Sequence, residues 1–585
     1  MHRIAEMEIN NYRSCKKTKI KFEPFTPLVG YNNAGKSNIL KCIDALVRGK
    51  AQTAPSFYDP AQPIEIIALL EGLNEQALAH LSGPQRTSLE PYIENGTLSI
   101  RFYQQTPGTG KTAVTMGIRS PSKLQDEWSN PNALPQAITT LFPEPTFINS
   151  MEDSAEDVSK FKAGNTIGKL ISNLQKEVIN AKGKEINTAL SAIGKKLNLS
   201  GSERLKEFSD FDDSINKKIK DFFPGLTLSL DIPTPDIGDL FKQGNIVVSE
   251  VGSQQVNDFS SMGHGAQRAI QMTLIRHLAE ITKDVSKDGK TNLLLIDEPE
   301  LFLHPQAIEQ IRGSLKSLSS KGYQVIFSTH SPFMIDQVDI PISNIVRKDQ
   351  SGTKVESRLK EAIESVLSDN ESQARLLFDT YNLGQILFSD KVLIAEGDTE
   401  KHVLPNLFKA LSGKTLGESK LALVISTGSH NIPGMLAILN EMNIPAKALA
   451  DLDFAFTVAK SKGLIEKKHH ELEGCLDILE EIQPAYGFCL NGRNPTKGND
   501  FKASDIFELL AQQDKAKDKI EVIRQHFIGQ SIWVWSKGAI EPHLSLEAKE
   551  TGEWYKFKQK LIDDPIDDVL EDKTHIEEFV NWCIN

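Results

Sequence analysis

Hydrophobic residues recur along this chain in the patterns of both strands and helices. From Ile4 to Ile9 they alternate with polar residues, which predicts a strand with one buried face, and a second strand is expected over Lys19–Phe22. The run Val392–Ala395 contains no polar residue and is typical of a short, fully buried strand. Because such strands are followed by helical segments, the pattern predicts an α/β protein.

The segment FTPLVGYNNAGKSNILKCIDAL, which begins at Phe25, contains a phosphate-binding pattern. A hydrophobic strand leads into the loop, the glycines and the Lys-Ser pair have P-loop spacing, and a helix follows. In such loops backbone amides surround phosphates, Lys36 reaches the β and γ groups, and Ser37 binds Mg²⁺. A chance glycine-rich loop is the alternative. The expected ATP-binding residues here are Gly30, Asn33, Gly35, Lys36, Ser37 and Asn38.

A second glycine-rich string, PGTGKT at Pro107–Thr112, looks superficially similar. The first glycine of the pattern would fall on Gln105, and no helix follows. The segments Leu98–Tyr103 and Thr112–Ile118 both alternate, so we interpret Gly108–Gly110 as the turn of a β-hairpin. We therefore expect no nucleotide at this string.

Between about Ser154 and Phe222 the hydrophobic residues take up helical spacing. We interpret this segment as a helical insertion, whose hydrophobic stripe serves either core packing or dimerisation. A solvated helix face explains its lysines better than a contact with nucleic acid does. These lysines are Lys182, Lys184, Lys195, Lys196, Lys217, Lys218 and Lys220.

Three later segments extend the ATPase pattern. A Ser/Gly-rich loop around Gly263 opens a helix, an arrangement that binds anions through exposed amides. The strand in NLLLIDEPELFLHP ends in Asp297 and Glu298, where a Mg²⁺-ordering aspartate and a glutamate that polarises the attacking water are expected. The buried strand VIFST precedes His330. Alone, such a histidine is more often structural, but in this order we interpret it as a γ-phosphate sensor.

Acidic residues follow two hydrophobic runs in the last third. The run Val392–Ala395 leads into Glu396, a glycine turn, and Glu400 in the first turn of the next helix. The strand in IPAKALADLDF ends in Asp451 and Asp453, which are two residues apart and would share one face of a strand. Carboxylates at the carboxyl ends of parallel strands suit Mg²⁺ or Mn²⁺. The alternatives are acids that serve a helix dipole and an Asx-rich turn.

These motifs resemble known families. The P-loop, the Gly-His-Gly loop, LLLIDEPE and Ser-Thr-His-Ser, in that order, look like the ABC-type ATPase heads of the SMC and RecF class, and INNYRSC is similar to their start. The segment EGDTE, the turn after LALVIST, and DLD resemble the Toprim domain of topoisomerases, primases and certain nucleases. The segment IWVWSKGAIE resembles the part that closes this site in one lineage. An ABC-type head joined to Toprim is the arrangement of the OLD (overcoming lysogenization defect) family of ATP-dependent nucleases.

The resemblance implies an ABC-type P-loop ATPase head with a helical insertion, followed by a Rossmann-like Toprim domain with a parallel central sheet. The signature loop of one subunit would close over the nucleotide of another, although only Gly263 matches the usual LSGGQ cleanly. The expected domains are 1–153 (ATPase, N-terminal part), 154–223 (helical insertion), 224–370 (ATPase, C-terminal part) and 371–585 (Toprim).

The resemblance also implies metal-dependent cleavage of phosphodiester bonds, with the ATPase as a gate. One ion would accompany ATP, near Ser37 and Asp297. Two Mg²⁺ or Mn²⁺ ions would lie at the Toprim site, where Lys537 would neutralise the transition state. The expected Toprim ligands are Glu396, Glu400, Asp451, Asp453 and Glu541.

The expected partner is nucleic acid, with double-stranded DNA favoured and RNA left open. A homodimer or higher homo-oligomer is expected, and an anti-phage operon could add a helicase or a reverse transcriptase as neighbour. A RecF-like repair ATPase with a non-catalytic Toprim scaffold is the alternative, and the complete set of acids argues against it. A topoisomerase or primase would need a reactive tyrosine module or a zinc-binding domain, and neither is visible in the sequence.

Composition narrows the compartment more than the function. The 585 residues suggest three or four domains, and the net charge of −12 gives no global attraction to nucleic acid. The five cysteines form no CxxC pair, which fits a reducing cytoplasm and argues against a zinc ribbon. Glu6 and Glu8 stand where a signal peptide needs hydrophobic residues, and no run approaches the roughly 18 residues of a membrane span. A cytoplasmic protein without a membrane partner is expected.

Overall fold

The computed structural model describes residues 1–123, 127–143, 145–149, 166–242, 247–249, 256–281, 290–336, 338–366, 382 and 385–584. Its contacts divide the chain into two compact units. Unit 1 comprises Met1–Arg13, Lys21–Phe25 and Ser37–Thr329, and unit 2 comprises Ser14–Ile20, Thr26–Lys36 and His330–Asn585. The expected domain boundaries at 153/154 and 370/371 lie outside the described residues.

Unit 1 contains an antiparallel sheet in which β1 (Arg3–Tyr12), β4 (Ile64–Glu71), β5 (Leu98–Gln104) and β6 (Thr115–Arg119) are neighbours. The buried positions of β4 alternate strictly, as its sequence IEIIALLE requires for a strand with one buried face. Strands β5 and β6 pair antiparallel, with Ser99 opposite Arg119 and Tyr103 opposite Thr115. The string PGTGKT therefore lies in a hairpin connection, as predicted.

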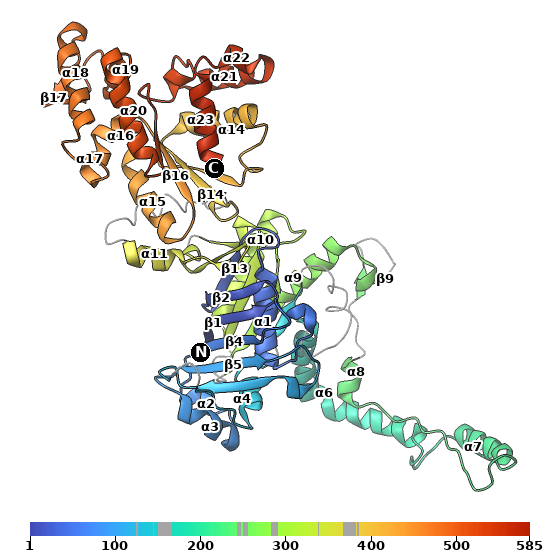
Figure 1. Ribbon diagram of the computed structural model, residues 1–585. Coiled ribbons are helices and arrows are strands. Elements are labelled where there is room, and N and C mark those ends of the chain that lie inside the picture. The colour runs from blue at the N-terminus through green and yellow to red at the C-terminus, as the bar shows by residue number, and fades with distance from the viewer. Residues whose placement is uncertain are drawn as a thin grey trace. The chain divides into compact units, whose positions relative to one another are not determined.

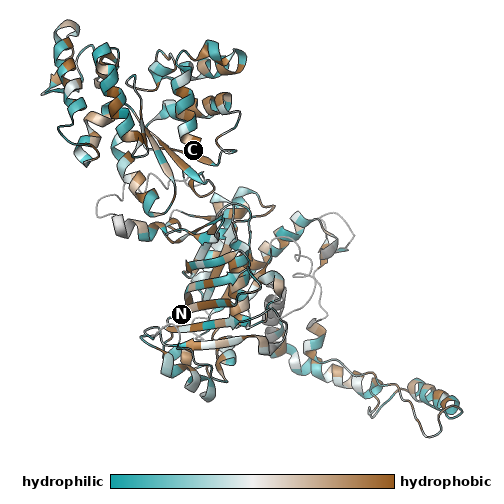
Figure 2. Ribbon diagram, in the orientation of Figure 1, coloured by the Kyte–Doolittle hydropathy of each residue, from teal (hydrophilic) through white to brown (hydrophobic). Residues whose placement is uncertain are grey.

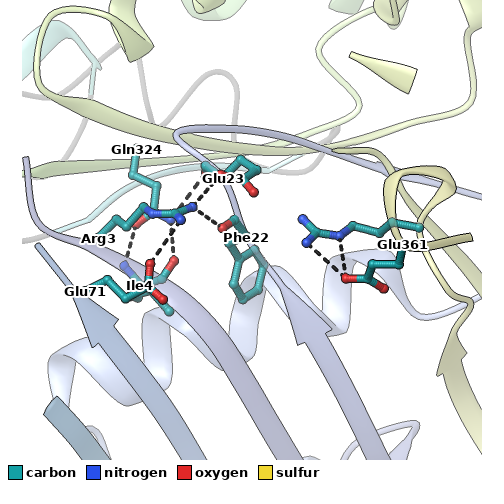
Figure 3. Close-up of polar contacts among 8 residues, drawn as sticks. Arg3, Ile4, Phe22, Glu23, Glu71, Gln324 and Glu361 are labelled. Atoms are coloured by element: carbon teal, nitrogen blue, oxygen red, sulfur yellow. Dashed lines mark hydrogen bonds and ion pairs between the residues drawn. The ribbon is translucent and has the colours of Figure 1, made fainter. Parts of the chain in front are cut away.

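Three parallel strands of unit 1 carry the ATPase segments: β7 (Thr146–Ile148), β10 (Asn292–Asp297) and β11 (Tyr323–Thr329). Every residue of β11 is buried, which explains its lack of alternation. Its one long polar side chain, Gln324, exchanges two hydrogen bonds with the backbone of Ile4 on β1, at 3.0 and 2.7 Å (Figure 3). The neighbouring Arg3 bonds Glu23, Glu71 and the carbonyl of Phe22.

Unit 1 also contains helices, which lie in the segments between its strands along the chain. The insertion is helical as predicted: α6 (Thr166–Leu197) and α7 (Lys206–Ile219) occupy it, and all seven of its singled-out lysines are exposed. The other α-helices are α1 (Lys36–Arg48), α2 (Glu75–Leu78), α3 (Gly83–Leu89), α4 (Leu134–Leu141), α8 (Ile237–Lys242), α9 (His264–Ile281) and α10 (Pro305–Ser319). A short antiparallel pair joins β8 (Val247–Ser249) and β9 (Val256–Asp258).

In unit 2, β3 (Phe25–Val29) pairs in parallel with β12 (Asn344–Asp349), which forms a hairpin with β13 (Gly352–Val355). The strand β2 (Cys15–Lys21) and the helix α11 (Leu359–Val366) also belong to this part of the chain. Arg358 precedes α11 and pairs with Glu361 in its first turn at 3.1 Å (Figure 3).

The C-terminal part of unit 2 is built on a parallel sheet of four strands (Figure 1). Their order is β15 (Leu421–Ile425), β14 (Lys391–Ala395), β16 (Ala446–Ala450) and β19 (Ile532–Val534), and each pair of neighbours is parallel. The predicted parallel central sheet is confirmed. Apart from Lys391 and Lys447, the residues of these strands are hydrophobic, and Figure 2 colours the residues of the chain by hydropathy.

Alternate residues of these strands belong to two separate cores, because successive strand side chains point to opposite faces. Val392, Ile394 and Ala448 pack with α15 (Ile432–Glu441), α18 (His470–Tyr486), α19 (Ala503–Ala511) and α20 (Asp514–Ile528). Leu393, Leu449 and Trp533 pack with α14 (Asp398–Ser412), α21 (Thr551–Asp563) and α23 (Lys573–Ile584) on the other face. The smaller elements are α16 (Asp453–Phe456), α17 (Val458–Lys462), β17 (Cys489–Asn491), β18 (Asn494–Thr496) and α22 (Ile566–Val569).

Among the described residues, no helix is both long and hydrophobic enough to cross a membrane. The five cysteines form no disulfide; four are buried and Cys489 is exposed.

Gly538 sets the course of the chain after β19. Its φ is +102°, and its carbonyl accepts a hydrogen bond of 2.7 Å from the amide of Leu452. A Cβ at this position would lie 2.7 Å from Cγ and 3.0 Å from Cα of Glu508 on α19. Neither the backbone conformation nor the space admits a larger residue.

We predict that Gly538→Ala lowers the free energy of unfolding by about 2–3 kcal/mol, because left-handed strain and overpacking add. Gly463→Ala is the matched control, since Gly463 has a φ of +73° and nothing within 4 Å of a Cβ. It should cost only about 1 kcal/mol. Urea unfolding followed by tryptophan fluorescence measures both, and equal losses would contradict the steric argument.

Candidate nucleotide and metal sites

The phosphate-binding loop connects β3 to α1. Gly30 and Gly35 have φ values of +155° and +108°, and Asn33 is left-handed at +67°. A Cβ on Gly35 would lie 2.0 Å from Oγ1 of Thr353. That hydroxyl donates to the carbonyl of Ala34 at 2.9 Å, so β13 fixes the loop from behind. The glycines of the pattern are therefore required by the backbone and its packing.

The ammonium of Lys36 is surrounded by acceptors. Nζ donates to the carbonyls of Gly30 and Tyr31, at 2.8 and 3.1 Å, and lies 2.9 Å from Nε2 of His330. Because Lys36 is the residue that reaches the β and γ phosphates in such loops, this contact places the His330 ring at the phosphate end of the loop. Its position fits the γ-phosphate sensor that the sequence predicts.

The next residue, Ser37, donates a 2.8 Å hydrogen bond to Oδ1 of Asp297 at the end of β10. Ser328 on β11 donates to the same oxygen. The predicted Mg²⁺-binding hydroxyl and carboxylate are thus in direct contact. Asn38 follows Ser37 in the first turn of α1. Donor chemistry and spacing fit the one ion that accompanies ATP.

Glu298 directly follows β10 with a φ of +50°, a conformation that a glutamate rarely adopts. Its amide donates to Oγ and to the carbonyl of Ser328, at 3.0 and 3.2 Å. Strain at a single residue is often found at functional sites, where surrounding contacts maintain it.

Arg268 on α9 supplies much of that support, and sequence reasoning gave it no role. Arg268 is 1% exposed, and its guanidinium donates to the carbonyls of Asp297 and Glu298, both at 2.7 Å. It also bonds Gln271 at 2.7 Å and the carbonyl of Asn149 at 3.1 Å. The helix begins at His264, directly after Gly263, so the predicted loop does open a helix. The sequence shows an arginine after a glycine-rich loop, but it does not show that this arginine bonds the backbone at Glu298, 30 residues later.

In the C-terminal sheet, acidic residues gather at the carboxyl ends of three strands. Glu396 follows β14, Asp451 follows β16, and Glu541 follows β19 through the turn at Gly538. Glu400 is in the first turn of α14, as predicted, and its Oε2 accepts from the amide of Gly397 at 3.2 Å. The amide of Asp451 donates to Oε2 of Glu396 at 3.4 Å, which joins two of the strand ends.

Asp453 reaches the site by a different route from the one predicted. Strand β16 ends at Ala450, and Asp453 is the first residue of α16. The expectation that Asp451 and Asp453 share one face of a strand is therefore wrong: the chain turns between them, and a helical residue delivers the second carboxylate. Oδ1 of Asp453 is buried without a hydrogen-bond partner.

Burial raises the pKa of four of these acids, and repulsion from neighbouring acids adds to the rise at three of them. Desolvation, with the nearby charge of Glu541, raises the pKa of Glu400 to about 7. Desolvation and the charges of Glu396, Glu400 and Glu541 raise the pKa of Asp451 well above its usual range. The pKa values of Glu396 and Asp453 are raised for the same first reason, burial. A divalent cation would offset this repulsion and favour the ionised carboxylates.

Two lysines belong to the site in different ways. Lys537 pairs with Asp572 at 2.9 Å, and Asp572 also accepts from His543 Nδ1 at 2.7 Å. The amide of Lys537 donates to His543 Nε2 at 3.1 Å, which fixes the neutral tautomer. Lys549, which sequence reasoning missed, lies 3.2 Å from Oε2 of Glu541 and 3.5 Å from Oδ2 of Asp451. No sequence motif marks Lys549, because it lies in an exposed loop before α21.

The donor set fits Mg²⁺ or Mn²⁺. Hard carboxylate oxygens lie at one edge of the sheet, one buried oxygen of Asp453 is unpaired, and an ammonium already lies between two of the acids. In the part of the chain that the structure describes, no three acidic, histidine or cysteine side chains are as close together as the ligands of a bound ion. Binding would therefore draw the carboxylates together. We take Glu396, Glu400, Asp451, Asp453 and Glu541 as the residues that would hold the ions.

Family models match both parts of the chain. The model described as "AAA ATPase domain" matches residues 3–79 and 103–335. The model described as "Overcoming lysogenization defect protein-like, TOPRIM domain" matches residues 387–453. These matches cover the P-loop, the DEPE segment, His330 and the first acids of the C-terminal sheet.

Among similar proteins, the Old nuclease of Escherichia phage P2 is 35% identical over 590 residues, which cover 99% of this chain and 99% of that protein. The OLD nuclease of Thermus scotoductus (strain ATCC 700910 / SA-01) is 21% identical and covers 77% and 82%. Endonuclease GajA of Bacillus cereus (strain HuB5-5) is 22% identical and covers 75% and 72%.

A solved SMC head bound to the C-winged helix domain of ScpA is 16% identical, with a TM-score of 0.37, and covers 61% of this chain and 99% of that one. The fold class expected from the sequence, a P-loop ATPase followed by a Toprim domain, is confirmed by the two family models and by the parallel sheets. Given the full-length similarity to the phage P2 protein, the chain belongs to the overcoming lysogenization defect (OLD) family, and it is an ATPase and a nuclease.

Proposed function

We propose that this protein is a metal-dependent DNA endonuclease whose cleavage is gated by its ATPase. The observation that carries the proposal is the set of five carboxylates at the carboxyl edge of one parallel sheet, of which Glu396, Glu400, Asp451 and Asp453 have a pKa raised first of all by burial. Bound divalent ions would supply an activated water and stabilise the leaving oxygen of a phosphodiester. The acids Glu396, Glu400, Asp451, Asp453 and Glu541 would hold these ions.

The residues around the carboxylates would orient the nucleic acid. Lys537, held by Asp572, would neutralise charge on the phosphate in the transition state. His543 would keep that lysine in place through the amide of Lys537 and through Asp572. Double-stranded DNA is the substrate we favour, and RNA is the alternative, because a metal site does not read the sugar.

In the ATPase, Lys36 and Ser37 would bind the triphosphate with its metal. Asp297 would support the metal, Glu298 would polarise the attacking water, and His330 would contact the γ-phosphate. Gly263 would meet the nucleotide of a second subunit in a homodimer or a higher homo-oligomer. We further propose a role in anti-phage defence, where a helicase or reverse transcriptase is a possible operon neighbour.

We predict that Glu400→Gln lowers nicking of supercoiled plasmid in Mg²⁺ or Mn²⁺ by about 100-fold or more, because a lost ligand costs at least as much as a lost outer-shell partner. The control is Glu441→Gln. Glu441 is exposed at the end of α15, which leads to the amino end of β16 and so lies at the edge of the sheet opposite to the acids. Parallel reactions with linear DNA and total tRNA identify the substrate. Cleavage undiminished in Glu400→Gln would contradict the metal site, and absence of cleavage by the parent protein would favour the RecF-like scaffold.

We predict that Glu298→Gln lowers ATP hydrolysis by about 100-fold or more, the usual contribution of a positioned general base, while ATP still binds. Phosphate release and binding of a fluorescent ATP analogue measure the two effects separately. Glu309→Gln, on the exposed side of α10, is the matched control. A Glu298→Gln protein that hydrolyses ATP at the parent rate would remove the glutamate from the mechanism.

A further inference from the structure

Lys549 is the cation of the acidic cluster. Its loop, residues 545–550, connects the turn at Glu541–His543 to α21, and residues 547–550 are exposed. About half of the Lys549 side chain is exposed (52%), yet its ammonium points inward to Glu541 and Asp451, at 3.2 and 3.5 Å. An exposed stem with an inward-pointing charge is held by electrostatic attraction rather than by packing.

The carboxylates that face Lys549 come from every element around it. Burial raises the pKa of Glu396 after β14, Glu400 on α14, Asp451 after β16 and Asp453 on α16, and the charge of Lys549 partly counteracts the rise at each of them. It does the same at Glu508 on α19, a half-buried acid beside Gly538. One positive charge thus offsets the repulsion among acids that the chain brings together from five elements.

We propose that Lys549 is a tethered counter-cation, which occupies the acidic cluster in the metal-free protein and leaves it when a divalent ion binds. The inference rests on the proposed metal site and adds a competitor to it. The contacts support displacement: both distances exceed those of a tight charge-assisted hydrogen bond, and the loop has room in solvent. Lys537, by contrast, is directed to Asp572 and does not compete.

Competition of this kind sets a threshold for metal binding. An ion with two charges gains more from the five carboxylates than one ammonium does, whereas a monovalent ion does not. The Toprim site would therefore stay assembled without metal, yet bind divalent ions more weakly than the same acids would without the lysine.

Binding of Mn²⁺ alone, without nucleotide, tests the inference on the full-length protein by electron paramagnetic resonance and calorimetry. We expect Lys549→Met to bind Mn²⁺ about tenfold more tightly than the parent, since a competing charge in two partly exposed ion pairs is removed. Lys556→Met is the matched control: it removes one positive charge from α21, where Lys556 pairs with Glu553 at 2.7 Å. Glu400→Gln identifies which binding belongs to the Toprim site.

Equal or weaker Mn²⁺ binding by Lys549→Met overturns the inference and leaves the proposed nuclease intact. If neither protein shows binding that depends on Glu400, the proposed metal site itself fails. A second measurement needs no variant: amine labelling of the parent protein, quantified by mass spectrometry, should increase at Lys549 but not at Lys556 when Mn²⁺ is added. Unchanged labelling at Lys549 would also overturn the displacement.

Discussion

Repulsion among buried carboxylates is the constraint on which the C-terminal half depends. Glu396, Glu400, Asp451, Asp453 and Glu541 lie at one edge of a parallel sheet, where burial and the neighbouring negative charges raise the cost of ionising Glu396, Glu400 and Asp451. This repulsion would push the strands and helices that carry the acids apart unless the packing of the domain held them together. Two hydrophobic cores, one on each face of the sheet, supply that resistance, because alternate residues of the same strands are fixed in both.

The ATPase half solves a related problem with hydrogen bonds. Glu298 has an unfavourable left-handed backbone, and the amide and carbonyl groups on either side of it are bonded to Ser328 and Arg268. The P-loop is supported in the same manner by Thr353, whose hydroxyl takes the space that a Cβ on Gly35 would need. In both halves, side chains distant in sequence maintain a local geometry that would be unstable alone.

Much of this could be predicted from the sequence wherever the signal is local. The strand, turn and helix around Glu400 are encoded in eleven consecutive residues, KVLIAEGDTEK, and the structure has them as expected. Asp453 was wrongly assigned to a strand because β16 ends only three residues before α16 begins. Hydrophobic periodicity does not locate the ends of elements to within so few residues. Lys549 and Asp572 were missed because they lie at positions with no motif. Asp572 pairs with Lys537 and His543, 35 and 29 residues away, and Lys549 lies 8 residues from Glu541 and 98 residues from Asp451. Arg268 follows the glycine-rich loop that the sequence shows, but the carbonyls that it bonds lie in another segment, and no pattern connects the two.

The hydrogen bonds of Arg268 have a mechanical consequence. A single guanidinium joins α9, which begins beside Gly263, to the backbone of both Asp297 and Glu298. If the carbonyls of Asp297 and Glu298 move with α9, the side chains of the same two residues move with them. Any displacement of α9 is thus transmitted to the residue that would orient water and to the one that would hold metal. Arg268 thus couples the loop at Gly263, which would contact a second subunit, to Asp297 and Glu298, which would take part in ATP hydrolysis.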